Sequence, residues 1–322
     1  MLKKTKDPRN CAGAGSSLYV SQNSQLATGD PLLERIQVNS WLLLAFGLLA
    51  LYGLHRLSWH LVRMIATGWQ PALGQLSLPW ARTGPVRAWM EEHAPRAYSF
   101  FRNRIQPHPF TGLPLTLFFA ALVYIVLLMG GLIEELLEGT ELNAIDKSIN
   151  DVLQTWRTPL LVVIFSWLTD LGGSSVLVGV TFVSTGFLWA DGRPRFIFPL
   201  WVAVAGSQFT TWLGKFAFDR DRPEFETFVT APFASFPSGH ATAAMAVYGF
   251  IAYALIRDLH GSKLKQRFEV IFWNVVLIGL IGFSRVYLSV HYASDVAMGY
   301  LVGLFWLLVA FTLSEYYRYD GN

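Results

Sequence analysis

Residues 284–295 read SRVYLSVHYASD, and this stretch decides how the rest of the chain is interpreted. It contains Arg285, then His291 six residues later, and then Asp295 four residues after the histidine. Strongly apolar segments lie on both sides of it, at 270–283 and 296–314. Charged side chains at the edge of such segments are costly, so their presence indicates a functional site.

Two further polar clusters stand at the edges of apolar segments. Residues 215–223, KFAFDRDRP, follow the apolar segment 196–214. Residues 235–240, SFPSGH, precede the apolar segment 241–256. Basic and histidine side chains are common ligands of anions. We therefore interpret the three clusters as parts of one phosphate-handling site at a membrane face.

The composition places the chain among membrane proteins. Of its 322 residues 53% are hydrophobic and only 15% are charged, whereas soluble domains have about 25% charged residues. The net charge of +3 does not indicate a nucleic-acid partner. Cys11 is the single cysteine, so no intramolecular disulfide can form. The first residues are basic but no apolar core follows them, which argues against a secretory signal peptide.

The apolar pattern predicts seven membrane-spanning helices, because a span needs about 20 apolar residues. Residues 1–35 are polar and rich in Gly and Ser, which predicts a flexible N-terminal tail. An Arg-rich connector, 55–109, follows the first span, and a C-terminal tail, 315–322, follows the last. Residues 159–169 are apolar but too short to cross a membrane. The predicted spans are 36–54, 110–133, 171–190, 196–214, 241–256, 270–283 and 296–314.

Basic residues in the short loops predict the orientation of the spans, because they favour the cytoplasmic side. The loop 191–195 contains two arginines and the loop 257–269 contains four basic residues, so both loops belong inside. The acidic stretch 134–157 then belongs outside, and the three polar clusters share that face. We expect a multi-pass protein of the cell membrane with its active site on the extracytoplasmic face.

Two polar stretches are interpreted as structural. The spacing of Ile145, Ile149 and Leu153 predicts a short amphipathic helix lying on the membrane surface. Residues 219–221, DRD, are interpreted as a solvated charge run and not as catalytic groups. A group of aromatic residues in the loop 223–237 either packs that loop or contacts a lipid chain: Phe225, Phe228, Phe233 and Phe236.

Lys215, Arg222 and Arg285 bring three positive charges to one membrane face. Like charges repel, so such a cluster needs an anion. Phosphate is the natural candidate, because Arg binds it through paired donors and Lys as a point charge. Ser238 and Gly239 stand just before an expected helix, where free backbone N–H groups and the helix dipole also favour an anion. These five residues form the predicted phosphate-binding set.

Two histidines and an aspartate complete the predicted site. His291 and Asp295 are four residues apart and share a face of a helix, so the aspartate can hold one ring nitrogen and leave the other free to attack. His240 is placed to protonate the leaving oxygen. This set predicts phosphoryl transfer through a phosphohistidine. The sequence has no acidic cluster suited to Mg²⁺, so we expect neither a metal nor a cofactor.

The three clusters together resemble the signature of the type 2 phosphatidic acid phosphatase (PAP2) superfamily. Its K-x6-R-P matches Lys215 and 222–223, its PSGH matches 237–240, and its S-R-x5-H-x3-D matches the 284–295 stretch. The resemblance covers roughly residues 110–314. It implies an all-α, polytopic membrane helix bundle with a six-helix core, preceded here by one extra N-terminal apolar helix. It also implies His291 as nucleophile, Asp295 as its partner, His240 as general acid, and Lys215, Arg222, Ser238, Gly239 and Arg285 as phosphate ligands.

The expected function is the hydrolysis of a lipid phosphomonoester or pyrophosphate at the bilayer. Phosphatidic acid, phosphatidylglycerol phosphate, a lipid A phosphate and an isoprenyl diphosphate such as undecaprenyl pyrophosphate are all candidate substrates. A phosphotransferase that passes the phosphoryl group to another lipid would use the same residues. A non-catalytic binder or transporter of anionic lipids needs only the cations, so the presence of both histidines and Asp295 argues against it. The sequence indicates no oligomeric state.

Overall fold

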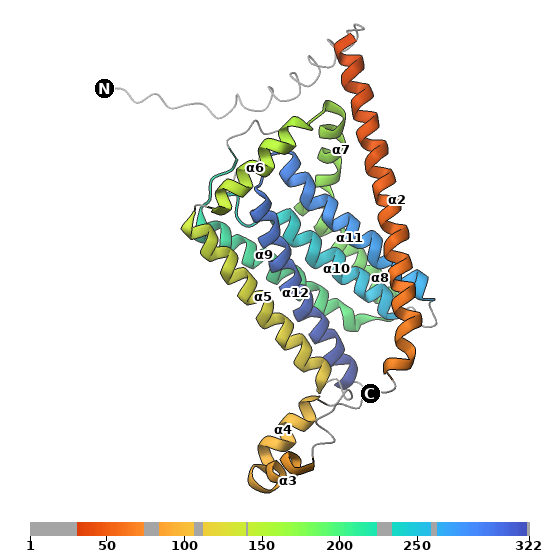
Figure 1. Ribbon diagram of the computed structural model, residues 1–322, viewed down its shortest axis with the longest axis vertical. Helices are drawn as coiled ribbons and strands as arrows, with labels where there is room; N and C mark the ends of the chain where they lie inside the picture. The colour runs from red at the N-terminus through yellow and green to blue at the C-terminus, as the bar shows by residue number, and fades with distance from the viewer. Residues whose placement is uncertain are drawn as a thin grey trace, which may run out of the picture. The chain divides into compact units, whose positions relative to one another are not determined.

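The computed structural model describes residues 31–73, 84–105, 112–139, 141–223, 234–258 and 263–320 (Figure 1). The chain divides into two compact units, residues 1–52 and 53–322, and helix α2 (Pro31–Leu73) runs from the first unit into the second. The regular structure of the described residues is all helical, which confirms the predicted fold class. The further elements are α3 (Gly84–His93), α4 (Pro95–Ile105), α5 (Leu113–Glu138), α6 (Glu141–Thr155), α7 (Pro159–Asp170), α8 (Ser174–Ala190), the 3-10 turn η4 (Pro194–Phe196), α9 (Ile197–Phe218), α10 (Gly239–Asp258), α11 (Leu264–Tyr287) and α12 (Ala293–Asp320).

Within the part of the chain that the structure describes, six helices are long and apolar enough to cross a membrane: the 40–67 part of α2, then α5, α9, α10, α11 and α12. Helices α7 and α8 pass the same test as a pair, but they are bent by 45° at the break between them. The count of seven therefore holds when this pair is one span. The sequence predicts the third span over 171–190 alone, with 159–169 set aside as too short. In the structure α8 begins at Ser174, and the segment 159–169 belongs to α7, the other arm of the bent pair.

Several helices are longer than the apolar pattern predicts. Helix α2 begins at Pro31 and continues to Leu73, so it includes the first part of the expected connector, whose later part contains α3 and α4. Helix α12 continues to Asp320, so the expected C-terminal tail is helical over most of its length. No Gly or Pro interrupts the chain from 304 to 320, and a helix can continue through polar residues. The predicted tail at residues 1–30 lies outside the described residues.

Helix α10 lies in the middle of the second unit, where it packs against α8, α9, α11 and α12 (Figure 1). Its buried face consists largely of small side chains, among them Ala243, Ala244 and Ala246. Towards the C-terminal end of α10, Phe250 belongs to a core cluster that includes Phe196, Leu200 of α9 and Leu307 of α12. Because α10 contacts four neighbours, its N-terminal residues are surrounded by the ends of other helices.

Glycines on α12 allow it to approach α10 closely. A Cβ at Gly299 would lie 2.7 Å from the Ser238 carbonyl oxygen, and one at Gly303 would lie 2.6 Å from the Thr242 carbonyl oxygen. The two glycines are four residues apart, a spacing that lets membrane helices pack at short range. At the end of this contact the Ser238 N–H donates to the Asp295 carbonyl, with N and O 2.9 Å apart. The sequence clusters 235–240 and 284–295 therefore meet through their backbones.

We expect Gly303→Ala to destabilise the protein, because the added methyl group must displace the Thr242 carbonyl. Overpacking of this kind typically costs about 1–3 kcal/mol. Gly279→Ala on α11 is the matched control, because a Cβ at Gly279 meets no atom within 4 Å. The thermal unfolding midpoint in detergent should fall for the first variant and stay level or rise for the second. Equal midpoints would contradict the importance of this close contact.

Candidate active site

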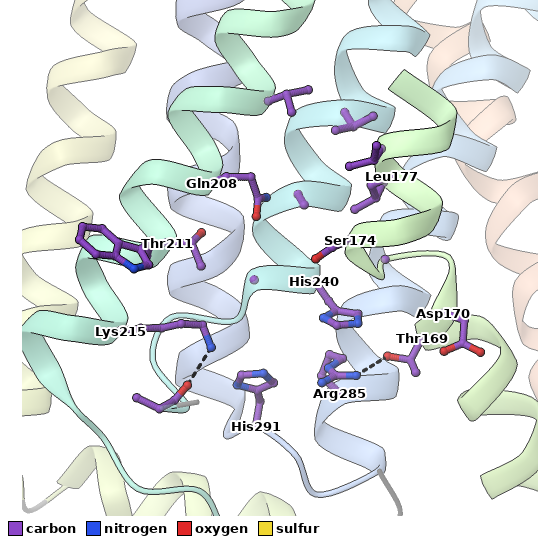
Figure 2. A pocket seen from close by; sticks show the side chains of 18 of the residues that line it. Thr169, Asp170, Ser174, Leu177, Gln208, Thr211, Lys215, His240, Arg285 and His291 are labelled. Atoms are coloured by element: carbon purple, nitrogen blue, oxygen red, sulfur yellow. Dashed lines mark hydrogen bonds between the residues drawn. The ribbon is translucent and has the colours of Figure 1, made fainter. Parts of the chain in front are cut away.

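A cavity of about 1010 Å³ lies among α7, α8, α9, α10 and α11 and the turn before α12. Figure 2 shows Lys215, His240, Arg285 and His291 gathered at one end of it, with Leu177 farther along. The far part is lined by apolar side chains of α8, α9 and α10. Six of the eight predicted site residues line the cavity: Lys215, Arg222, Gly239, His240, Arg285 and His291.

The three predicted cations are fixed by neutral acceptors from three other segments. Lys215 Nζ donates to the Ala234 carbonyl at 2.8 Å, and Arg222 donates through Nη1 to the Val290 carbonyl. Arg285 Nη1 donates to Thr169 Oγ1 at 2.8 Å, as the dashed line in Figure 2 shows. These three neutral oxygens fix the groups in place and do not themselves carry a charge that would oppose them. The cavity end therefore gathers three basic side chains, with Asp170 as a carboxylate on its wall.

Two buried polar atoms at this end have no hydrogen-bond partner among the described residues. They are Ser238 Oγ and Arg285 Nε, on side chains that belong to residues 0% and 3% exposed. Leaving a buried polar group unpaired costs about 1–3 kcal/mol. Arg285 lines the cavity, whereas Ser238 lies beside its lining residue Gly239. The oxygens of a phosphate group accept several hydrogen bonds at once, so an anion bound here would satisfy Arg285 Nε.

His291 and Asp295 form the predicted pair, although not on one helix: His291 lies in the turn before α12 and Asp295 in the first turn of α12. His291 Nδ1 lies 3.4 Å from Asp295 Oδ2, and that oxygen also accepts the Tyr292 N–H at 2.9 Å. An ionised carboxylate can only accept, so the proton of the neutral ring sits on Nδ1 and the lone pair is on Nε2. Burial lowers the pKa of His291 to about 4, although its hydrogen bond to Asp295 acts in the opposite direction. The ring is therefore neutral at neutral pH.

His240 lies in the first turn of α10 and faces the same end of the cavity (Figure 2). The corner between α7 and α8 packs against it. A Cβ at Gly172 would lie 3.2 Å from the His240 Cβ and 2.5 Å from the Ile281 side chain. Gly172 thus allows the bend of the broken span to close over this histidine.

The turn that presents His291 is held from several sides. Arg157 Nε donates to the Tyr287 carbonyl at 2.8 Å, and its Nη2 donates to Ser289 Oγ. Ser289 has a φ of 55°, in the left-handed region that non-glycine residues seldom adopt. The Val290 N–H donates to the Arg285 carbonyl at 3.1 Å. These contacts fix the position of the turn between α11 and α12.

The interpretation of residues 219–221 as a solvated charge run is wrong for Arg220. Its side chain is only 11% exposed, and it donates to Asp295 Oδ1 at 2.6 Å and to Asp146 Oδ2 at 2.9 Å. Asp219, in contrast, is exposed and ends α9 with a φ of 37°. The local sequence could not identify the buried member of the run, because its partners lie 74 and 75 residues away.

The amphipathic helix predicted around residues 145–153 to lie on the membrane surface instead packs against the helix bundle. The helix forms as α6, but Ile145 is 55% exposed, while Asp146 and Asn150 are buried. Ile149 and Leu153 pack against a cluster from α10, α11 and α12. The inner face of α6 thus combines apolar and polar groups, because it covers the charged end of the bundle. Of the loop aromatics, Phe236 is buried in a core cluster, and the other three lie outside the described residues.

Comparison with known proteins agrees with this geometry. The family model described as PAP2 superfamily matches residues 196–319. Phosphatidylglycerophosphatase B of Bacillus subtilis (strain 168) is 32% identical over 161 residues, which cover 49% of this chain and 78% of the relative. This chain belongs to the PAP2 superfamily.

A solved PAP2 structure has a similar fold. The crystal structure of a transmembrane PAP2 type phosphatidylglycerolphosphate phosphatase from Bacillus subtilis matches with a TM-score of 0.55 and 27% identity, over 59% of this chain and 93% of that chain. The predicted enzyme class is thereby confirmed: the chain is a phosphoric ester hydrolase of the membrane lipid phosphatase family. It is also a multi-pass membrane protein, as predicted.

In this PAP2 protein we expect orthovanadate, a phosphate mimic, to raise the thermal unfolding midpoint. The anion would pair with the cations that line the cavity and with Arg285 Nε, which has no partner among the described residues. A ligand at 100 times its Kd stabilises a folded protein by about 2.7 kcal/mol. Arg285→Met should abolish most of the shift. Arg193→Met is the control, because Arg193 pairs with Asp191 in the loop before α9. An equal shift in both variants would place the anion elsewhere.

Proposed function

We propose that this protein hydrolyses the phosphomonoester of a membrane lipid through a phosphohistidine formed on His291. One observation carries the proposal most directly. The Nδ1 of His291 faces Asp295, while the ring lines the same end of the cavity as Lys215 and Arg285. A neutral imidazole with a free Nε2 next to fixed cations is suited to attack a bound phosphate.

The proposed reaction has two steps. Nε2 of His291 attacks phosphorus, the bond from phosphorus to the lipid oxygen breaks, and His240 gives a proton to that oxygen. Water then attacks the phosphohistidine, with His240 taking a proton from the water. The P–N bond breaks, and inorganic phosphate and free His291 result. Lys215, Arg222 and Arg285, with Ser238 and the backbone at Gly239, would bind the phosphate oxygens in both steps.

The cations also support a reaction without a metal. Positive side chains can stabilise the charge on a transferring phosphoryl group as a metal ion would. Among the described residues no three His, Cys, Asp or Glu side chains are close enough to hold a metal ion. The proposed mechanism assigns this stabilising role to Lys215, Arg222 and Arg285.

The shape of the cavity supports a lipid substrate. Its volume exceeds what a phosphate group needs, and Leu177, Val178, Val204 and Val247 line the part away from the cations. An apolar chain attached to the bound phosphate could occupy that part. The relative is named phosphatidylglycerophosphatase B, so phosphatidylglycerophosphate is our first candidate substrate.

The test is phosphate release by the purified protein in detergent with EDTA present. The panel would contain phosphatidylglycerophosphate, phosphatidic acid, a lipid A phosphate and undecaprenyl pyrophosphate. We expect release from at least one glycerophospholipid phosphate. His291→Ala should show no turnover, and His240→Ala should be slower by about 10²–10⁴-fold. Activity that requires added Mg²⁺, or an active His291→Ala variant, would contradict the mechanism.

We further propose that the active site lies on the extracytoplasmic face. The site residues come from the end of α9, the start of α10, the end of α11 and the start of α12, which all lie at one end of the bundle. Arg193, Arg195, Arg257 and Lys265 lie at the other ends of these helices. Basic residues in short loops favour the cytoplasmic side, so the charged cavity would face outward.

Cysteine labelling in sealed vesicles tests this orientation. Cys11 is the single native cysteine and would be replaced by Ser. Ser148→Cys on the exposed side of α6 and Lys265→Cys in the first turn of α11 would provide the two sites. An impermeant maleimide should label the first from outside and the second only after permeabilisation. Labelling of both from the same side would refute the proposed topology.

A further inference from the structure

The two oxygens of Asp295 have different partners. Oδ2 faces His291, while Oδ1 accepts from Arg220 Nη1 at 2.6 Å. The other terminal nitrogen of Arg220 donates to Asp146 Oδ2 and to Asn143 Oδ1, each at 2.9 Å. A continuous chain of contacts thus runs from α6 through Arg220 and Asp295 to the ring of His291.

Ser294 closes this chain into a rigid unit. Its N–H donates to Asp146 Oδ1 at 3.0 Å. Its hydroxyl donates to Asp146 Oδ2 and accepts a hydrogen bond from Arg220 Nη1. The Arg220 guanidinium also lies over the Tyr292 ring, 4.3 Å from the ring centroid. The side chains of Asp146, Arg220 and Asp295 are 1%, 11% and 0% exposed. Such burial is tolerated only when charges are paired and hydrogen-bonded.

Two carboxylates share the single guanidinium of Arg220, so its attraction is divided between Asp146 and Asp295. The two oxygens of Asp295 have separate partners. The hydrogen bonds from Arg220 and from the Tyr292 N–H fix the carboxylate in space with Oδ2 facing His291.

We propose that Arg220, held by Asp146 of α6, is a positioning residue that orients Asp295 so that it holds Nδ1–H of His291. This inference rests on the proposed function, since it assigns Arg220 a part in the action of the proposed nucleophile. Among the described residues, those that line the cavity include Arg222 and not Arg220. Arg220 therefore acts through Asp295 and not on the phosphate.

The test uses Arg220→Met, Arg220→Lys and Asp295→Asn, with Arg193→Met as the matched control. Turnover of an aryl phosphate makes the readout independent of lipid identity, and vanadate affinity reports phosphate binding. We expect Arg220→Met to lower kcat by roughly 10- to 100-fold, by analogy with the loss of a hydrogen-bonding partner behind a metal-ligating histidine. Vanadate affinity should change by less than about 3-fold, or ~0.65 kcal/mol, because Arg220 does not line the cavity. Arg220→Lys should recover part of kcat, because it keeps the positive charge beside Asp295. Recovery should be incomplete, because one ammonium cannot bridge both carboxylates as a guanidinium does.

The double variant Arg220→Met with Asp295→Asn decides between positioning and general stabilisation. If Arg220 acts through Asp295, the double variant should be no slower than Asp295→Asn alone. Multiplying losses, or a vanadate affinity that falls in step with kcat, would overturn the inference. Should Arg220→Met not fold, Asp146→Asn carries the test: we expect a smaller kcat loss at constant vanadate affinity, and an unchanged kcat would overturn it.

Wild-type activity separates this inference from the proposed function. An active wild type with an unimpaired Arg220→Met variant would overturn the positioning role alone. A wild type that forms no phosphohistidine and hydrolyses no phosphate ester would overturn both.

Discussion

Mutual repulsion among Lys215, Arg222 and Arg285 is the constraint on which the rest of the site depends. At the edge of a bilayer such repulsion is only partly screened by water. Each cation is restrained by an oxygen from a different segment: the Ala234 carbonyl, the Val290 carbonyl or the Thr169 hydroxyl. This arrangement of the three cations therefore requires α7, α9, α11 and the turn before α12 to be in place together.

The same constraint explains the close helix contacts around the site. Lys215 and Arg285 lie in the last turns of α9 and α11, so the packing of these helix ends determines where the two cations lie. The glycines of α12 bring α10 near enough for the backbone bond between Ser238 and Asp295. Gly172 lets the corner of the broken span reach His240. Small residues thus serve positioning here as much as packing.

The sequence could predict the parts of the site that are local. Lys215 and Arg222, His240, and the pair His291 and Asp295 lie at fixed short spacings, and each group borders an apolar segment long enough to recognise. The alternating direction of successive spans also predicted that these groups lie on the same membrane face. The bend between α7 and α8 did not follow, because an apolar pattern measures length and not direction.

Arg220 shows where sequence reasoning fails for a physical reason. In the chain it stands between two acidic residues, as a solvated arginine usually does. Its burial depends on Asp146, which belongs to a helix that reads as amphipathic and superficial. Only the tertiary structure brings a carboxylate from α6 to the start of α12. The pairing of distant charges cannot be inferred from one sequence when each charge alone has an ordinary local explanation.

Burial and the carboxylate act on His291 in different ways. Burial lowers the pKa of the ring to about 4, so at neutral pH the ring is uncharged and Nε2 keeps its lone pair. Asp295 decides which nitrogen holds the proton, because it can only accept. When Nε2 attacks phosphorus in the proposed reaction, the ring becomes positive and its attraction to Asp295 grows. An interaction that strengthens towards the transition state accelerates the step. Arg220 would oppose this gain if its charge were unbalanced, and the Asp146 carboxylate, 2.9 Å from it, provides the balance.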